Sequence, residues 1–189
     1  MTPSFLILHG YLGSGPDHWQ TWLAGRLRAA GETVAYPDLP DPAAPMLSAW
    51  RAALDTVLAG GDGEPTVIAH SLGCILWLHQ CAAGPARAHR VLLVAPPSRA
   101  GASEPLHDFF PVPLEPAALG AETRLVCAPE DPYCPEGAEH HYGVPLGIPV
   151  DVLPGAGHVN PDAGFGPWPE VEAWCYGASA IASSRIAPG

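Results

Sequence analysis

Lysine is absent from the 189-residue sequence, and all eight basic residues are arginine. This absence excludes the lysine of a phosphate-binding P-loop, a Schiff-base lysine and a Ser–Lys catalytic dyad. Acidic residues outnumber basic ones, and the formal net charge is −11. Because such a chain has no basic patch that could displace counterions, we expect it to bind neither nucleic acid nor an anionic membrane.

Long apolar runs are also missing. No stretch reaches the roughly 18 apolar residues that a membrane-spanning helix needs. No basic segment precedes the apolar residues 5–8, so we expect no signal peptide. The five cysteines form no C-x-x-C pair, and Cys74, Cys81 and Cys127 lie in apolar runs. We therefore expect reduced thiols and a cytoplasmic protein.

The residues that are present suffice for one folded domain. Hydrophobic residues make up 48% of the chain, and its many prolines and glycines separate apolar runs without forming a repeat. Strand-length runs alternate with helical patterns, which predicts a parallel sheet with right-handed crossovers. We expect an α/β three-layer sandwich of about six mostly parallel strands flanked by helices. It should form one domain over residues 1–177, followed by a frayed tail over 178–189.

The pattern also predicts where each element lies. Strands are expected at 4–8, 33–36, 66–69, 90–95, 122–128 and 148–153. Helices are expected at 17–30, 46–59, 72–83, 135–142 and 168–176. Asp17 is a suitable N-cap for the first helix, with Gln20 in the capping-box position three residues later.

The stretch 64–80 carries the most informative motif. A strand-length run, Thr66–Ala69, is followed by His-Ser-Leu-Gly and then at once by an apolar run of helical length. This is the G-x-S-x-G nucleophile elbow of an α/β-hydrolase, with alanine in the first glycine position. The turn should strain the backbone of Ser71 and expose its hydroxyl. Small residues at Ala69 and Gly73 allow strand and helix to approach closely.

A serine nucleophile needs a neutral imidazole as base and a carboxylate that orients the imidazole. In α/β-hydrolases the three residues follow the chain order Ser, acid, His. Here Ser71, Asp131 and His158 have this order, and each follows a predicted strand. Because sites in parallel sheets form beyond the carboxyl ends of the strands, the three side chains should meet there.

Other residues compete for these roles. Glu130 is a rival acid one position from Asp131, whereas Asp151 lies inside a strand and should face a helix layer. His70 should point away from Ser71 and serve packing. His9 should mainly support its loop.

A metal site is not expected. His140, His141 and Glu139 could be read as a metal cluster, but adjacent residues diverge on a helix. We predict no cofactor.

The tetrahedral intermediate of acyl transfer requires two hydrogen-bond donors for its oxyanion. One should be the backbone N–H of Leu72, directly after the nucleophile. The other should be the N–H of Tyr11, in the glycine-rich loop after the first strand. A flexible strand–helix turn is the alternative interpretation of this loop. It is not a phosphate loop, because it lacks both G-x-G-x-x-G and a following Lys-Ser/Thr.

These residues predict a serine hydrolase that cleaves a small ester, thioester or activated amide through an acyl-Ser71 intermediate. Its partner would be this small-molecule substrate. His9, Phe109, Phe110 and Tyr133 could line the substrate pocket, although the aromatic residues could equally cover the core. The alternative is a hydrolase-fold binding or regulatory protein with little turnover, because a fold does not determine function.

The chain also resembles a known family, the small serine hydrolases related to retinoblastoma-binding protein nine, in their bacterial YdeN-like branch. The resemblance spans nearly the whole domain. It rests on the stretches 8–10, 14–20, 69–73, 94–97, 131–134, 156–160 and 164–170. It implies an α/β-hydrolase core without the usual large cap and a Ser71–Asp131–His158 triad. It also favours Asp131, the aspartate before Pro132, over Glu130.

Overall fold

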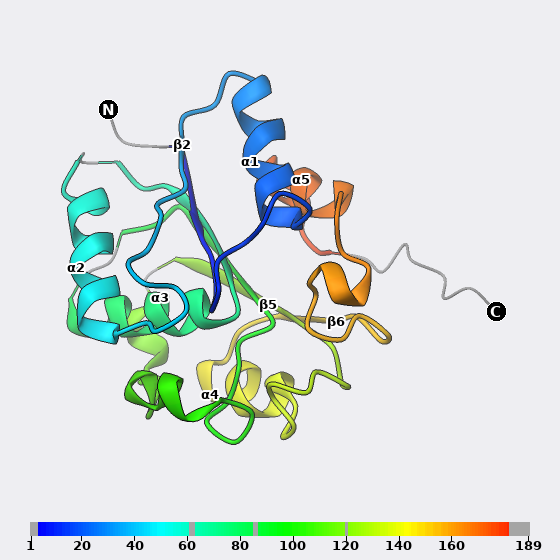
Figure 1. Ribbon diagram of the computed structural model, residues 1–189. Coiled ribbons are helices and arrows are strands. Elements are labelled where there is room, and N and C mark those ends of the chain that lie inside the picture. Colours follow the sequence, from blue (N-terminus) through cyan, green and yellow to red (C-terminus); the bar gives the residue numbers. More distant parts are fainter. Residues whose placement is uncertain (1–3, 61–62, 85–86, 120, 182–189) are drawn as a thin grey trace.

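The computed structural model describes residues 4–60, 63–84, 87–119 and 121–181 (Figure 1). Six parallel strands form one sheet in the order β2-β1-β3-β4-β5-β6. The strands are β1 (Phe5–Leu8), β2 (Val34–Ala35), β3 (Thr66–His70), β4 (Arg90–Val94), β5 (Glu122–Cys127) and β6 (Val150–Val152). The α-helices are α1 (Trp19–Ala29), α2 (Leu47–Leu58), α3 (Leu72–Ala83), α4 (Val144–Leu146) and α5 (Pro169–Cys175).

Two helical layers cover the sheet, because successive residues of a strand face opposite sides. In β1, Leu6 and Leu8 belong to the core cluster that also contains Trp50 of α2 and Trp77 of α3. The alternate residues of β1 belong to a second cluster on the other face, with Trp19 of α1 and Trp174 of α5. Figure 1 shows α1 and α5 together on one side of the sheet and α2 and α3 on the other. The predicted three-layer α/β sandwich is confirmed.

The chain order reverses between two neighbouring strands. From β1 the chain passes outward to β2, and it then returns to the other side of β1 to form β3. Loops that leave such adjacent strands diverge and open a crevice at the carboxyl ends of the strands, where ligands bind in open α/β sheets. The glycine-rich loop after β1 and the serine turn after β3 lie at this point.

The segment between β4 and β5 is a long connection between neighbouring strands. It contains two 3₁₀ helices, η1 (Glu104–Phe109) and η2 (Pro116–Ala118). Another irregular segment precedes β6, in which a π-helix, η3 (Glu139–Gly143), runs into α4. A short 3₁₀ helix, η4 (Pro161–Ala163), follows β6. All predicted strands and helices are found, with ends shifted by a few residues.

The segment that follows α5 is anchored, at least at its start. The Ile181 N–H donates to Asp151 Oδ2 at 2.7 Å, and the Ile181 side chain is buried. The Ala178 carbonyl accepts a hydrogen bond from Arg90. The expectation of a frayed tail is therefore corrected for residues 178–181, because the Arg90 and Asp151 side chains bind its backbone. Residues 182–189 lie outside the described part of the chain.

Candidate active site

Ser71 occupies the turn between β3 and α3 and has the strained backbone that its motif predicts. Its φ is 53° and its ψ is −125°, in a region that non-glycine residues rarely adopt. The Ser71 N–H donates to the Val94 carbonyl at the end of β4, at 2.9 Å. This bond ties the turn to the neighbouring strand and holds the strained conformation.

Glycines at two positions permit the close packing around this turn. A Cβ on Gly10 would lie 2.7 Å from Ser71 Cβ. A Cβ on Gly73 would lie 2.6 Å from the Leu8 carbonyl oxygen. Gly73 thus lets α3 approach the end of β1, whereas the sequence motif predicted an approach to the helix's own strand.

Ser71, His158 and Asp131 form a continuous hydrogen-bonded chain. Ser71 Oγ lies 2.9 Å from His158 Nε2. His158 Nδ1 lies 2.9 Å from Asp131 Oδ2 and 3.1 Å from Oδ1. Because a carboxylate only accepts, Nδ1 carries the proton, and Nε2 is left to accept the serine proton. Three residues that are distant in sequence thereby have the contacts that a nucleophile, a base and an orienting acid require.

The second carboxylate, Glu130, makes a different contact. Its Oε1 accepts a long hydrogen bond from the Gly157 N–H, 3.4 Å away, on the loop that carries His158. Asp131 is almost fully buried, and its Oδ1 also accepts from the Tyr133 N–H at 2.9 Å. The geometry therefore pairs the imidazole with Asp131. Asp151, the other rival acid, forms an ion pair with Arg124 at 2.8 Å.

The two residues predicted to supply oxyanion donors, Tyr11 and Leu72, line the same cavity as Ser71. Leu72 is the first residue of α3, so its N–H has no intrahelical acceptor. Within the described residues, neither this N–H nor that of Tyr11 donates to a protein acceptor. Tyr11 and Leu72 both line the cavity in front of Ser71. Two unpaired N–H groups beside a serine hydroxyl are the arrangement that a developing oxyanion requires.

The cavity in front of Ser71 has a volume of about 550 Å³. Its walls come from the loops after β1, β4, β5 and β6, and Gly101, Ser103 and Leu106 line the side nearest η1. A Cβ on Gly101 would lie 2.2 Å from the Tyr133 carbonyl oxygen, so this glycine lets the β4–β5 connection close against the loop of Asp131. The volume is within the range of small-molecule sites.

Only one of the predicted pocket residues lines this cavity. Tyr133 does so, is 45% exposed, and its ring contacts the His158 ring edge-on at 4.4 Å between centroids. Phe109 and Phe110 belong instead to the core cluster beneath α2 and α3, where Phe109 packs against Trp50. The expectation that these two residues line the pocket is corrected, because the connection between β4 and β5 turns their rings inward, where they cover apolar surface.

His9 supports its loop and borders a separate hollow. Its Nδ1 lies 2.8 Å from the Gly10 carbonyl, and its Nε2 accepts from the Leu39 N–H at 3.1 Å. Burial lowers the pKa of His9, although the hydrogen bond to Gly10 opposes this shift. The ring lines a neighbouring cavity of about 420 Å³ and not the one in front of Ser71. Its inclusion among the pocket residues is therefore corrected.

Sequence reasoning missed two side chains that hold the His158 loop in place. His70 Nε2 lies 2.9 Å from the His158 carbonyl, and Trp19 Nε1 donates to the Val159 carbonyl at 2.8 Å. Val159 has a positive φ of 50°, unusual for a β-branched residue. Its strain at this position is consistent with a loop fixed by contacts from α1 and β3. No sequence motif signals such contacts, since they join residues 88 and 140 positions apart.

The start of α1 differs from the predicted capping box. The N-cap is His18, whose Nδ1 accepts from the Gln20 N–H at 3.1 Å, and Asp17 lies outside the helix. Gln20 is fully buried, and its amide donates to the Leu8 carbonyl at 2.9 Å. Its Oε1 accepts from Ser14 Oγ at 2.8 Å. Gln20 thus ties the glycine-rich loop to the end of β1 and does not cap the helix.

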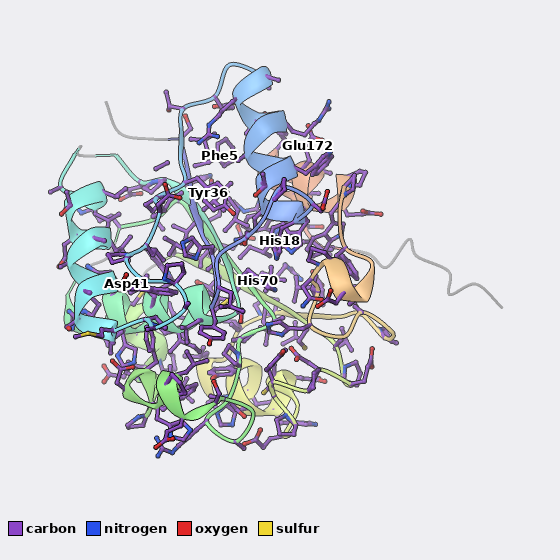
Figure 2. All side chains as sticks on the ribbon, in the orientation of Figure 1. Phe5, His18, Tyr36, Asp41, His70 and Glu172 are labelled. Atoms are coloured by element: carbon purple, nitrogen blue, oxygen red, sulfur yellow. The ribbon has the colours of Figure 1, made fainter. Side chains whose placement is uncertain are left out.

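The three histidines around the site lie close to one another. The His70 ring is 4.9 Å from that of His18 and 5.0 Å from that of His158, between centroids. Figure 2 shows His18 beneath the first turn of α1 and His70 next to it at the end of β3. Burial lowers the pKa of His70, and the nearby His158 and His18 lower it further.

The remaining candidate cluster lies on η3. Glu139 and His140 are exposed, and His141 is half-buried. Among the described residues, no group of three or more His, Cys, Asp or Glu side chains is placed to hold a metal ion. Within the same residues, no helix has the length and apolar content that crossing a bilayer demands.

The parallel sheet, the serine turn after β3 and the carboxyl-end site define an α/β-hydrolase fold. The chain belongs to the serine hydrolase family, which matches residues 5–176. The predicted fold class and family are thus confirmed, and the protein is assigned to the hydrolases.

Among known proteins, YdeN of Bacillus subtilis strain 168 is 36% identical over 74 residues, a stretch that spans 39% of each chain. The crystal structure of the B. subtilis ydeN gene product has a TM-score of 0.79 and 23% identity, over 93% of this chain and 97% of that one. A YdeN-like protein of Pectobacterium atrosepticum has a TM-score of 0.77 and 21% identity, over 90% and 87%. Carboxylesterase CesB of B. subtilis shares the fold at a TM-score of 0.62 and 14% identity, over 93% and 82%.

Proposed function

We propose that this protein is a serine hydrolase that cleaves a small, uncharged ester, thioester or activated amide through an acyl-Ser71 intermediate. The observation that carries the proposal is the unbroken chain of hydrogen bonds from Ser71 Oγ through His158 to Asp131, at 2.9 Å for each closest contact. Fold alone would not support this activity, because many hydrolase-fold proteins have other roles.

The chemistry follows from the roles of the three side chains. His158 Nε2 takes the Ser71 proton as Oγ forms its bond to the substrate carbonyl carbon. The backbone N–H groups of Leu72 and Tyr11 stabilise the resulting oxyanion. The protonated His158 then gives its proton to the leaving alcohol, thiol or amine, and the acyl group stays on Ser71. A water molecule, deprotonated by His158, releases the acid and restores the free serine.

The walls of the cavity favour uncharged substrates. Among its lining residues no arginine is present, and Asp162 is the sole carboxylate. An anionic acyl or leaving group would meet this carboxylate without a compensating cation, inside a protein of net charge −11. We therefore infer a preference for neutral acyl and leaving groups that fit a volume of about 550 Å³.

Cytoplasmic location remains part of this proposal, with the small-molecule substrate as the sole partner. It rests on the five cysteines, which are free thiols. Burial raises the pKa of Cys81 and of Cys134 to about 12, so these two remain protonated and unreactive. Fractionation of cells that express the untagged protein tests the location, and recovery outside the cytoplasm would contradict it.

Labelling with a fluorophosphonate probe tests the proposed function. We expect the wild type to gain one probe adduct on Ser71, detected by intact mass and peptide mapping, and Ser71→Ala to gain none. Ser103→Ala is the matched control, because Ser103 also lines the cavity but is no part of the hydrogen-bonded chain of Ser71, His158 and Asp131. The Ser103→Ala protein should still be labelled. Folded wild type that resists the probe would refute the proposal.

A panel of p-nitrophenyl esters of increasing acyl length then defines the acyl group. Turnover by the wild type, with none by Ser71→Ala, separates an enzyme from a binding protein. The alternative, a binding or regulatory role, predicts negligible turnover and a stoichiometric partner that Ser71→Ala binds equally well.

A further inference from the structure

His18 lines the cavity beside Ser71 and His158, yet it has no part in the hydrogen-bonded chain. Its side chain is only 5% exposed. It contacts the His70 ring at 4.9 Å and the Trp19 ring at 5.5 Å between centroids. A polar ring so deeply buried normally has hydrogen-bond partners for both nitrogens.

One nitrogen of the ring is engaged. Nδ1 accepts the Gln20 N–H and so caps helix α1. An imidazole nitrogen that accepts a hydrogen bond carries no proton, and in the neutral ring the proton must then be on the other nitrogen. The cap therefore determines the tautomer, and Nε2 of His18 is a donor.

The other nitrogen is free to face the cavity. Within the described residues, Nε2 of His18 donates to no protein atom, and it is not among the fully enclosed polar atoms that lack a partner. Burial, together with the nearby His158 and His9, lowers the pKa of His18 to about 4. At neutral pH the ring thus offers one uncharged N–H to whatever occupies the cavity.

We propose that His18 binds the substrate, donating a hydrogen bond from Nε2 to an ether, hydroxyl or carbonyl oxygen located next to the scissile carbonyl. This inference rests on the proposed function and narrows its substrate class to esters that carry a second oxygen acceptor in the acyl or the alcohol part. A substrate without that oxygen leaves the nearly buried N–H of His18 without an acceptor. Because an unpaired donor in a buried site costs free energy, such a substrate should be cleaved more slowly than one that carries the oxygen.

The substitution His18→Asn isolates this role. Asparagine is among the best N-cap residues, so it keeps the acceptor for the Gln20 N–H. Its side chain is too short to supply a donor where Nε2 lies. His140→Asn is the matched control, since it makes the same change on an exposed histidine of η3, away from the cavity.

Two pairs of isosteric esters, each differing by one CH₂→O exchange, provide the readout. p-Nitrophenyl butyrate and p-nitrophenyl methoxyacetate differ in the acyl part, and butyl and 2-methoxyethyl acetate differ in the alcohol part. The ratio of kcat/KM within a pair, compared between wild type and variant, cancels the intrinsic reactivity of the esters. In one of the pairs, we expect His18→Asn to lower the ratio of kcat/KM for the oxygen-containing ester to that for its isostere roughly three- to tenfold. His140→Asn should leave the ratios of both pairs unchanged.

The outcomes separate this inference from the proposed function. If the fluorophosphonate probe does not label Ser71, the proposed function itself fails. If Ser71 is labelled and His18→Asn changes neither ratio, the proposed function stands and the role of His18 is overturned.

A second measurement covers the case in which His18→Asn does not fold. In ¹⁵N-histidine-labelled Ser71→Ala protein, the Nε2 resonance of His18 should shift more with an oxygen-containing ester than with its isostere. Equal shifts within both pairs of esters would overturn the proposal.

Discussion

His70 Nε2 lies 2.9 Å from the backbone carbonyl oxygen of His158, so the residue that precedes Ser71 holds the loop that carries His158. Because the carbonyl oxygen accepts, Nε2 carries the proton, and the buried ring stays neutral as its pKa is lowered by burial. The same ring packs edge-on against Trp19, whose own N–H holds the next carbonyl of that loop. The positions of Ser71 and His158 are therefore coupled through one side chain.

We predict that His70→Phe lowers kcat roughly 10- to 100-fold, because a displacement of about 1 Å in a reacting group has effects of this size. The substitution keeps the ring volume and removes the donor. Steady-state kinetics with an ester substrate measures the effect, and KM should change less than kcat. His79→Phe is the control, since His79 also bonds a backbone carbonyl, that of Phe109, but far from the triad. Equal losses in both variants would contradict a positioning role.

Exchange of the two neighbouring carboxylates tests which acid serves His158. Asp131→Asn should lower kcat by roughly 10⁴-fold, since an amide at this position favours the wrong imidazole tautomer. Glu130→Gln should retain most of the activity, because its carboxylate accepts a long hydrogen bond from the Gly157 N–H, at 3.4 Å, and among the described residues it has no hydrogen bond to His158. The two variants make the same change, from a carboxylate to an amide, at adjacent positions. A larger loss in Glu130→Gln would assign the acid to Glu130.

Gly10→Ala should abolish probe labelling of Ser71 while the protein remains folded. The added methyl group would lie 2.7 Å from Ser71 Cβ and 3.1 Å from its Oγ, so either the serine or the oxyanion loop must move. Gly15→Ala, in the same loop, has open space around its Cβ and should be labelled at nearly the wild-type rate. Labelling rates and circular dichroism of both variants are compared. Normal labelling of Gly10→Ala would contradict this prediction, because it would show that the loop can move away from Ser71 without loss of reactivity.

Asp151→Ala should lower the free energy of unfolding by about 2 kcal/mol, since it leaves the mostly buried Arg124 without its partner. The Arg124 and Asp151 side chains are 15% and 12% exposed, and Asp151 also accepts the Ile181 N–H. Urea denaturation measures the change. Glu172→Ala removes the more exposed pair with Arg26 and should have a much smaller effect. Equal changes in the free energy of unfolding for the two variants would mean that burial of the Arg124–Asp151 pair adds nothing to stability.

The stability of the protein should fall as the pH drops from 6.5 towards 4, in part because of His18. Its pKa is about 4 when folded and returns to the ordinary 6.5 when the chain unfolds. Between these values the unfolded state binds more protons, so protonation favours unfolding, and the full stabilisation is present only above pH 6.5. Urea denaturation at several pH values should show a shallower decline for His18→Asn than for the wild type. Identical declines would rule out this contribution.

The sequence sufficed for the order of elements and for the residues at the ends of the strands. A parallel sheet follows from apolar runs that alternate with helical patterns, and its carboxyl ends must share one edge. For that reason Ser71, Asp131 and His158 could be named together although 60 positions separate the first two. The structure brings these three within hydrogen-bonding distance, and their role in catalysis stays a prediction until Ser71 is labelled.

Local pattern also has a limit, and α1 shows it. Asp17 and Gln20 form an acceptable capping box, yet His18 caps the helix, because Gln20 is drawn inward to the Leu8 carbonyl. In the same way, Phe109 and Phe110 are aromatic residues of a long connection, and only packing against Trp50 and its neighbours determines that they face the core.

The sequence by itself thus determined the fold class, the family and the strand ends that Ser71, Asp131 and His158 follow, because these depend on hydrophobic period, chain order and one short motif. Tertiary structure alone decided which side chains hold the His158 loop, which acid faces the imidazole and which residues line the cavity. Each of these depends on contacts between distant segments, and a side chain's direction at a loop is set by the packing it meets there. No local pattern encodes that packing.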